Sequence, residues 1–264
     1  MSGMSYQTIL YSTEGRVARI LFNRPEVHNA FNSALIREVD EAVERAGQNE
    51  NIRVVVFSGT GKSFCAGADL NWMREIIHFS FDQNLQESLE IAEVMHKIYT
   101  LAKPTIARVN GAAIGGGNGF LSACDIVVAS EEAIFGLSEV KLGLVPAAIS
   151  PYVILRIGEG RAREYFLTGE RISAQRAYEI GLANRVVPAE KLDEAVNAII
   201  SSLLSSGPQA LASSKELIQN AARMTFDEAK QYTARMIAQL RISAEGQEGM
   251  AAFLEKRKPN WVKE

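Results

Sequence analysis

Residues 106–125 constrain this chain most, because three successive glycines interrupt an otherwise apolar stretch. A strand-like run leads into Gly115, Gly116 and Gly117, and an apolar, helix-like run follows them. Glycines leave backbone N–H groups uncovered, and the start of a helix carries partial positive charge. The pattern therefore favours a place that holds an anion, either a phosphate or an oxyanion that forms during a reaction. A tight turn packed in a core is the alternative.

Residues 62–70 (KSFCAGADL) repeat this design of strand, small residues and helix. They follow the strand-like run at 54–57 and precede a helical stretch. Two such segments could each aim one N–H group at a single oxygen, and the best candidates are those of Ala68 and Gly116. Together they would form an oxyanion hole.

The two segments resemble the enoyl-CoA hydratase/isomerase (crotonase) superfamily. The resemblance rests on residues 64–70, on Asn110-Gly111 with the glycine triplet, and on residues 135–139 (FGLSE), and it runs nearly end to end. It implies an acyl-CoA thioester as substrate. Members are commonly trimers or dimers of trimers, so a homotrimer or homohexamer is expected.

The fold implied by the resemblance is α/β, a crotonase-like spiral of repeated ββα units with a helical C-terminal region. We expect the spiral and the active site in residues 1–200 and a helical oligomerisation region in residues 201–264. At 264 residues and 47% hydrophobic content, the chain can bury a sizeable core. The pattern predicts a hairpin over 9–22, a helix over 34–48 capped by Asn32 or Ser33, strands over 53–58, 125–129, 133–135 and 185–187, and helices over 161–167, 173–180, 193–205, 209–221, 226–240 and 247–256.

Glu139 is the candidate acid or base, a role that the resemblance implies. Its apolar neighbours Leu137, Val140 and Leu142 would raise the pKa of its carboxyl toward the working pH. The reaction would then pair this carboxyl with the donors of the oxyanion hole, which stabilise an enolate formed from the thioester. An ordinary surface glutamate is the alternative.

One departure from the family pattern concerns Gly119. Typical hydratases carry a second glutamate two residues past the glycine triplet, where this chain has Gly119. Isomerases of the superfamily use a single glutamate at the position of Glu139. Residues 68–73 and 138–152 nevertheless resemble methylglutaconyl-CoA hydratases, which likewise lack that glutamate. We therefore expect reversible hydration of an enoyl-CoA, with 3-methylglutaconyl-CoA as one substrate to test. Double-bond isomerisation and non-catalytic acyl-CoA binding are the alternatives.

Further residues are expected to contact the substrate. Arg24 is a candidate for a CoA phosphate, and a solvated arginine is the alternative. Trp72 could form a wall of the acyl pocket or belong to the core. Residues 145–151 are apolar and broken by proline, so we expect them to line the cavity. The full set of predicted contacts is Arg24, Ala66, Asp69, Leu70, Trp72, Gly119, Pro146, Phe253 and Lys256, of which the last two would lie near a neighbouring subunit's CoA.

Other sites are not supported. A net charge of −3 and no basic run longer than 256–258 argue against nucleic-acid partners. A phosphate-binding loop would need glycine where the chain has Val56. A dinucleotide site would need glycine where the chain has Phe120. Ser138 lacks the closing glycine of a hydrolase nucleophile turn.

No metal or separate cofactor is expected, since coenzyme A is part of the substrate. Cys65 and Cys124 have no histidine or carboxylate partners at ligand spacing and are interpreted as reduced core residues. The chain shows neither a secretory leader nor an 18-residue apolar span, so a cytoplasmic protein without a membrane partner is expected. No catalytic role is assigned to the histidines, His28, His78 and His96.

Overall fold

The computed structural model describes residues 6–262, whose strands form two sheets. The larger sheet has the order β1-β2-β3-β5-β7-β10 and the smaller one β4-β6-β8-β9. All neighbours are parallel except β1 with β2 and β8 with β9. The strands are β1 (Ile9–Glu14), β2 (Val17–Phe22), β3 (Val54–Gly59), β4 (Ser63–Cys65), β5 (Thr105–Val109), β6 (Ala112–Ile114), β7 (Ile126–Ser130), β8 (Ile134–Gly136), β9 (Arg171–Ser173) and β10 (Arg185–Val187).

From β3 to α5 the chain repeats one unit: a strand in the larger sheet, a strand in the smaller sheet, then helical structure. The predicted spiral of ββα units is therefore confirmed. The α-helices are α1 (Ser33–Gln48), α2 (Leu70–Ile76), α3 (Phe81–Thr100), α4 (Gly116–Ala123), α5 (Ser150–Thr168), α6 (Ala174–Glu179), α7 (Leu192–Ser205), α8 (Pro208–Ala221), α9 (Phe226–Ile242) and α10 (Ala244–Leu254), and the 3-10 helices are η1 (Pro25–Val27), η2 (Glu139–Leu142) and η3 (Ala189–Lys191).

Strand β3 shows how the larger sheet is buried. Val55 and Phe57 belong to the core that α1 covers, whereas Val54 and Val56 belong to a second core formed with α7. Alternate side chains of a strand point to opposite faces, so a continuous apolar run suits a strand covered on both sides. The strand predicted over 53–58 is confirmed, and it is buried on both faces. Each such side chain contributes about 1.5–3 kcal/mol on burial.

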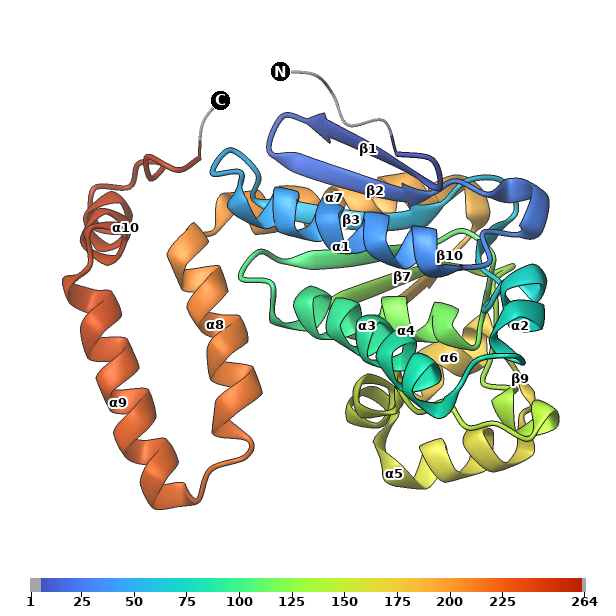
Figure 1. Cartoon of the computed structure of the whole chain (residues 1–264). Coiled ribbons are helices and arrows are strands. Elements are labelled where there is room, and N and C mark those ends of the chain that lie inside the picture. The colour runs from blue at the N-terminus through green and yellow to red at the C-terminus, as the bar shows by residue number, and fades with distance from the viewer. Residues whose placement is uncertain (1–5, 263–264) are drawn as a thin grey trace.

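The helices α8, α9 and α10 form an arm that extends away from the two sheets (Figure 1). Neither α8 nor α9 contains a buried residue, and α10 contains only Ala252. Lys215 attaches α8 to the core through an ion pair with Asp125 of 2.8 Å. The expected division at residue 200 falls inside α7, and the division into two domains stays a prediction. No helix within residues 6–262 is long and apolar enough to cross a membrane.

Other local expectations have mixed outcomes. The role of 145–151 as cavity lining stays a prediction; Val145 is 71% exposed and Ser150 begins α5. Pro146 itself is buried. The helix expected over 161–167 is only the second half of α5, which bends at Gly158. The short strands β4, β6 and β9 were not predicted as strands of a second sheet, because three residues are too few to show a period.

Candidate active site

Three neighbouring parallel strands, β4, β6 and β8, each end just before a predicted catalytic residue. Ala68 lies three residues beyond β4, Gly116 two residues beyond β6, and Glu139 three residues beyond β8. The carboxyl ends of parallel strands meet at one edge of a sheet, which is where ligands bind in such folds. The fold therefore brings these three residues, distant in sequence, to one place.

Backbone hydrogen bonds hold the Ala68 segment against Phe31. The N–H of Phe31 donates to the oxygen of Gly67 (2.8 Å), and the N–H of Asp69 donates to the oxygen of Phe31 (2.9 Å). In a parallel pair, this pattern of hydrogen bonds points the N–H of the residue between Gly67 and Asp69 away from the neighbouring strand. That residue is Ala68, which is partly exposed. Its N–H is thus not used by this bridge and can serve a ligand.

Gly116 is the first residue of α4, so its N–H has no acceptor within the helix. The preceding Gly115 has φ +53° and donates its N–H to the oxygen of Gly136 at 2.8 Å. Asn118, fully buried, donates to the oxygens of Ala113 (2.9 Å) and Gly136 (2.8 Å). These bonds tie the first turn of α4 to the ends of β6 and β8. The Gly116 N–H is therefore oriented before any ligand arrives.

The carboxyl of Glu139 lies against the turn that carries Gly116. A β-carbon on Gly115 would stand 3.1 Å from Oε1 of Glu139. Glu139 is half-buried, and its Oε2 is buried with no hydrogen-bond partner among the described residues. Burial raises the pKa of this carboxyl, and a weaker interaction with its own backbone N–H acts in the opposite direction. A carboxyl with a raised pKa, close to an N–H donor at the start of a helix, is suited to proton transfer.

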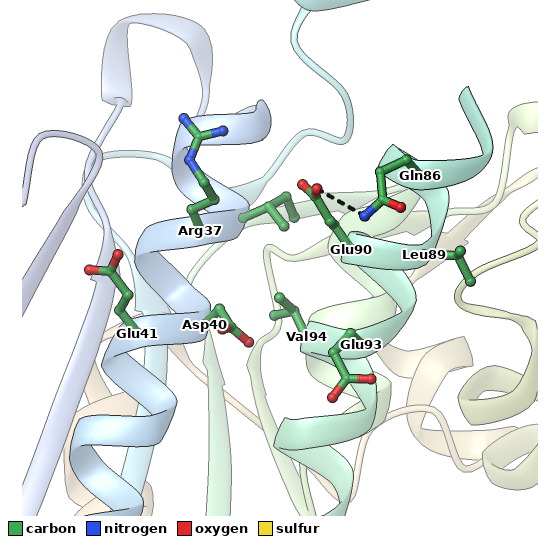
Figure 2. Close-up of a pocket in the computed structure, with 9 residues that line it drawn as sticks. Arg37, Asp40, Glu41, Gln86, Leu89, Glu90, Glu93 and Val94 are labelled. Atoms are coloured by element: carbon green, nitrogen blue, oxygen red, sulfur yellow. Dashed lines mark hydrogen bonds between the residues drawn. The ribbon is translucent and has the colours of Figure 1, made fainter. Parts of the chain in front are cut away.

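A separate groove of about 540 Å³ lies between α1 and α3 (Figure 2). Its lining includes the carboxylates of Asp40, Glu41, Glu90 and Glu93 and one cation, Arg37. It shares no lining residue with the turn at Gly116, and a negatively charged wall would repel the phosphates of coenzyme A. The groove is therefore not the candidate active site. Within residues 6–262 no group of three metal-ligating side chains is present.

Comparison with known proteins identifies the family. The family model described as enoyl-CoA hydratase/isomerase matches residues 12–264. The chain belongs to the enoyl-CoA hydratase/isomerase family. A crystal structure of an enoyl-CoA hydratase from Shewanella pealeana has 41% identity and a TM-score of 0.94, over 97% of this chain and 96% of that one. That match confirms the predicted crotonase fold.

Two curated relatives in the enoyl-CoA hydratase/isomerase family are each 33% identical to this chain. The crotonyl-CoA hydratase of Syntrophomonas wolfei is aligned over 98% of this chain and 99% of its own length. The short-chain-enoyl-CoA hydratase of Clostridium acetobutylicum is aligned over 97% of both chains. These names and the family match confirm the prediction of an enzyme. They do not bear on the methylglutaconyl-CoA subtype, which stays a prediction.

The second glutamate of typical hydratases in this family has no space here. A β-carbon on Gly119 would lie 2.3 Å from Cγ2 of Ile149 and 3.1 Å from Cε of Met95. Those two side chains, from the start of α5 and from α3, fill the volume that a glutamate at 119 would need. The glycine is therefore part of a packed contact, and Gly119 does not offer a polar surface to a substrate.

Arg24 and Asp69 form an ion pair of 2.7 Å. Arg24 also donates to the oxygen of Ala30 at 2.6 Å. Burial alone would raise the pKa of Asp69, but hydrogen bonds from Arg24 and from the N–H groups of Asn71 and Trp72 hold it below its usual value. Asp69 is thus the N-cap of α2. Contact of either residue with CoA stays a prediction, and Arg24 has this structural role in addition.

The other residues predicted to contact the substrate differ in burial and in position. Trp72 is buried and its ring lies 5.5 Å from that of Phe31. Ala66 is half-buried, whereas Leu70 is 69% exposed. Phe253 is 82% exposed on α10 and Lys256 follows that helix, so both lie on the arm and away from α2 (Figure 1). Their proximity to a neighbour's CoA stays a prediction.

Two cysteines next to the site are core residues, as predicted. Cys65 and Cys124 are buried and free. Burial raises the pKa of each thiol to about 12. Neither can supply a thiolate near neutral pH.

Proposed function

We propose that this protein is a hydratase that adds water reversibly across the 2,3-double bond of an enoyl-CoA thioester. The observation that carries the proposal is the half-buried Glu139 beside Gly115, one residue from the unused N–H of Gly116. A single carboxyl with one unpartnered oxygen can take a proton from water and return it to carbon. The N–H groups of Ala68 and Gly116 then serve as the oxyanion hole.

In this mechanism Glu139 removes a proton from water while the water oxygen bonds to the β-carbon. The π electrons of the 2,3-double bond move toward the thioester and form an enolate oxygen, which accepts hydrogen bonds from Ala68 and Gly116. The enolate then collapses, and Glu139 delivers its proton to the α-carbon. Atoms and charge balance without a separate cofactor. Each oxyanion donor would contribute about 2.7–4 kcal/mol of barrier lowering.

Double-bond isomerisation is the second candidate, and the packing at Gly119 favours it. Ile149 and Met95 leave no space there for a second carboxylate to hold the water. One carboxyl could instead remove a proton from the γ-carbon and return it to the α-carbon through the same stabilised enolate. The two activities share every residue of the site and differ only in whether water enters.

The acyl group is proposed as 3-methylglutaconyl, from the resemblance of residues 68–73 and 138–152. A dicarboxylic acyl chain needs a cation near its free carboxylate. Arg74 is the candidate: it lies in α2 two residues after Trp72, is exposed, and donates to the side chain of Asn71 at 2.6 Å. Such an exposed arginine can turn toward a substrate at little cost.

The assembly is proposed to be a homotrimer or homohexamer. In support, the arm exposes large apolar side chains that a monomer would leave in water: Phe226 (98%), Ile242 (81%), Phe253 (82%) and Leu254 (79%). A neighbouring core that covered them would also receive Phe253 and Lys256 near its CoA.

The test is incubation with a panel of enoyl-CoA thioesters, 3-methylglutaconyl-CoA included, with products identified by mass and NMR. Formation of a 3-hydroxyacyl-CoA supports the hydratase, and a thioester with a moved double bond supports the isomerase. Titration calorimetry provides a check that is independent of turnover. Coenzyme A should supply most of the binding energy, so equal affinity for a thioester and its free acid would contradict the assignment.

A further inference from the structure

Phe31 contacts both segments that carry the proposed oxyanion donors. Its backbone brackets Ala68, since Phe31 bonds to Gly67 on one side and Asp69 on the other. Its side chain lies on the second donor: a β-carbon on Gly116 would stand 2.4 Å from Cε1 and 2.7 Å from Cζ of Phe31. The ring therefore packs directly on the α-carbon of Gly116.

The ring of Phe31 is held on its other sides. It lies 5.5 Å from the ring of Trp72 and 6.2 Å from that of Phe120, centroid to centroid. Phe31 is only 5% exposed. Aromatic rings packed in this way keep one orientation, because interiors are as dense as organic crystals.

Trp72 is itself fixed by Glu87 of α3. The indole N–H of Trp72 donates to Oε1 of Glu87 at 2.8 Å, and the hydroxyl of Ser33 donates to the same oxygen at 2.9 Å. Glu87 thus connects α2 with the start of α1, the helix that begins two residues after Phe31. The chain of contacts runs from Glu87 through Trp72 and Phe31 to Gly116.

We propose that Phe31 is a positioning residue that sets the spacing between the Ala68 and Gly116 N–H groups. The inference rests on the proposed oxyanion hole. The backbone of Phe31 fixes the Ala68 segment, and the ring of Phe31 limits how closely the Gly116 segment can approach. Both donors must point at one oxygen, and a misplacement of about 1 Å can cost about 10²-fold in rate. The ring acts through the donors and need not touch the substrate.

The first test compares Phe31→Leu with the unaltered protein. Leucine keeps the site apolar and leaves the backbone bonds intact, but it removes the ring from Gly116. We expect kcat to fall by about 10- to 10²-fold with a smaller change in KM. A conjugated arylenoyl-CoA adds a spectroscopic readout, because hydrogen bonds to its carbonyl shift its absorption to longer wavelength. The shift on binding should be smaller in Phe31→Leu.

Phe22→Leu is the matched control. Phe22 is fully buried and its ring lies 4.9 Å from that of Phe120, so the substitution removes a core ring without removing one from Gly116. It should lower the melting temperature to a similar extent and keep both kcat and the absorption shift. An equal loss of kcat in both variants would overturn the inference, since the effect would then reflect general destabilisation.

A double variant tests the contact itself. Gly116→Ala should lower kcat because its β-carbon collides with the Phe31 ring. Phe31→Ala removes the ring, so the combined variant should be less impaired than the product of the two separate losses. Purely multiplicative losses would overturn the inference. If the unaltered protein bound the probe without any shift of its absorption, the proposed oxyanion hole would be overturned together with this inference. If Phe31→Leu kept the full absorption shift and the full kcat, only this inference would be overturned.

Discussion

Gly119 and Ile149 are packed so closely that a β-carbon on residue 119 would lie 2.3 Å from Cγ2 of Ile149. The place of the second glutamate is therefore occupied by an apolar side chain, and the absence of that carboxylate is built into the fold. Any hydration here must therefore proceed without a carboxylate at position 119, and Glu139 is the proposed acid and base.

Gly119→Glu should not increase hydratase activity and should destabilise the protein. The added volume alone lowers the free energy of unfolding by about 1–3 kcal/mol, and burial of a carboxylate lowers it further. Gly160→Glu is the matched control, because nothing lies within 4 Å of a β-carbon there. Urea unfolding should show a loss of stability for Gly119→Glu only. A stable Gly119→Glu variant with faster hydration would contradict the packing.

Glu139→Gln should raise the melting temperature at about pH 7.5. Burial raises the pKa of Glu139, so the folded state penalises the ionised carboxyl, and glutamine removes that charge. The gain should shrink as the pH falls through the raised pKa, where the wild-type carboxyl is protonated. The exposed Glu132→Gln provides the control. If Glu139→Gln were less stable than the wild type at every pH, the ionised carboxyl of Glu139 would not be destabilising.

Deletion from Gln247 onward should reduce the molar mass seen by light scattering and weaken binding of CoA thioesters. The deletion removes most of α10 together with the exposed Phe253 and Leu254. Phe253→Glu should weaken assembly without shortening the chain, and Gln231→Glu, at an exposed position of α9, should leave it unchanged. An unaltered protein that is monomeric at micromolar concentration would contradict the proposed assembly.

Features that depend on residues near one another in the sequence were predicted correctly. The hairpin β1–β2, a cap at Asn32 or Ser33 and the strand β3 follow from turn, capping and periodicity rules. All three are present, with the cap at Asn32. The side chain of Asn32 accepts from the N–H of Leu35 at 3.0 Å. Family resemblance singled out Glu139, for which spacing alone left a surface role and a catalytic role open.

Contacts between distant segments could not be predicted. The sequence shows that Gly119 replaces a glutamate, but not that Ile149 and Met95 fill the space, because nothing local couples these positions. The same holds for Phe31, whose contacts with Ala68 and Gly116 exist only after the sheets have formed. Residue type offered one signal for Phe31, a large apolar side chain in a loop otherwise rich in polar residues.

The most direct test of the central claim is turnover of an enoyl-CoA in D₂O, followed by NMR and mass analysis of the product, for the unaltered protein and Glu139→Gln. We expect a 3-hydroxyacyl-CoA with one deuteron at the α-carbon, and a rate about 10²–10⁴-fold lower in Glu139→Gln with almost unchanged affinity. A product with only a moved double bond would contradict hydration. Full hydratase activity in Glu139→Gln would contradict the assignment of the base.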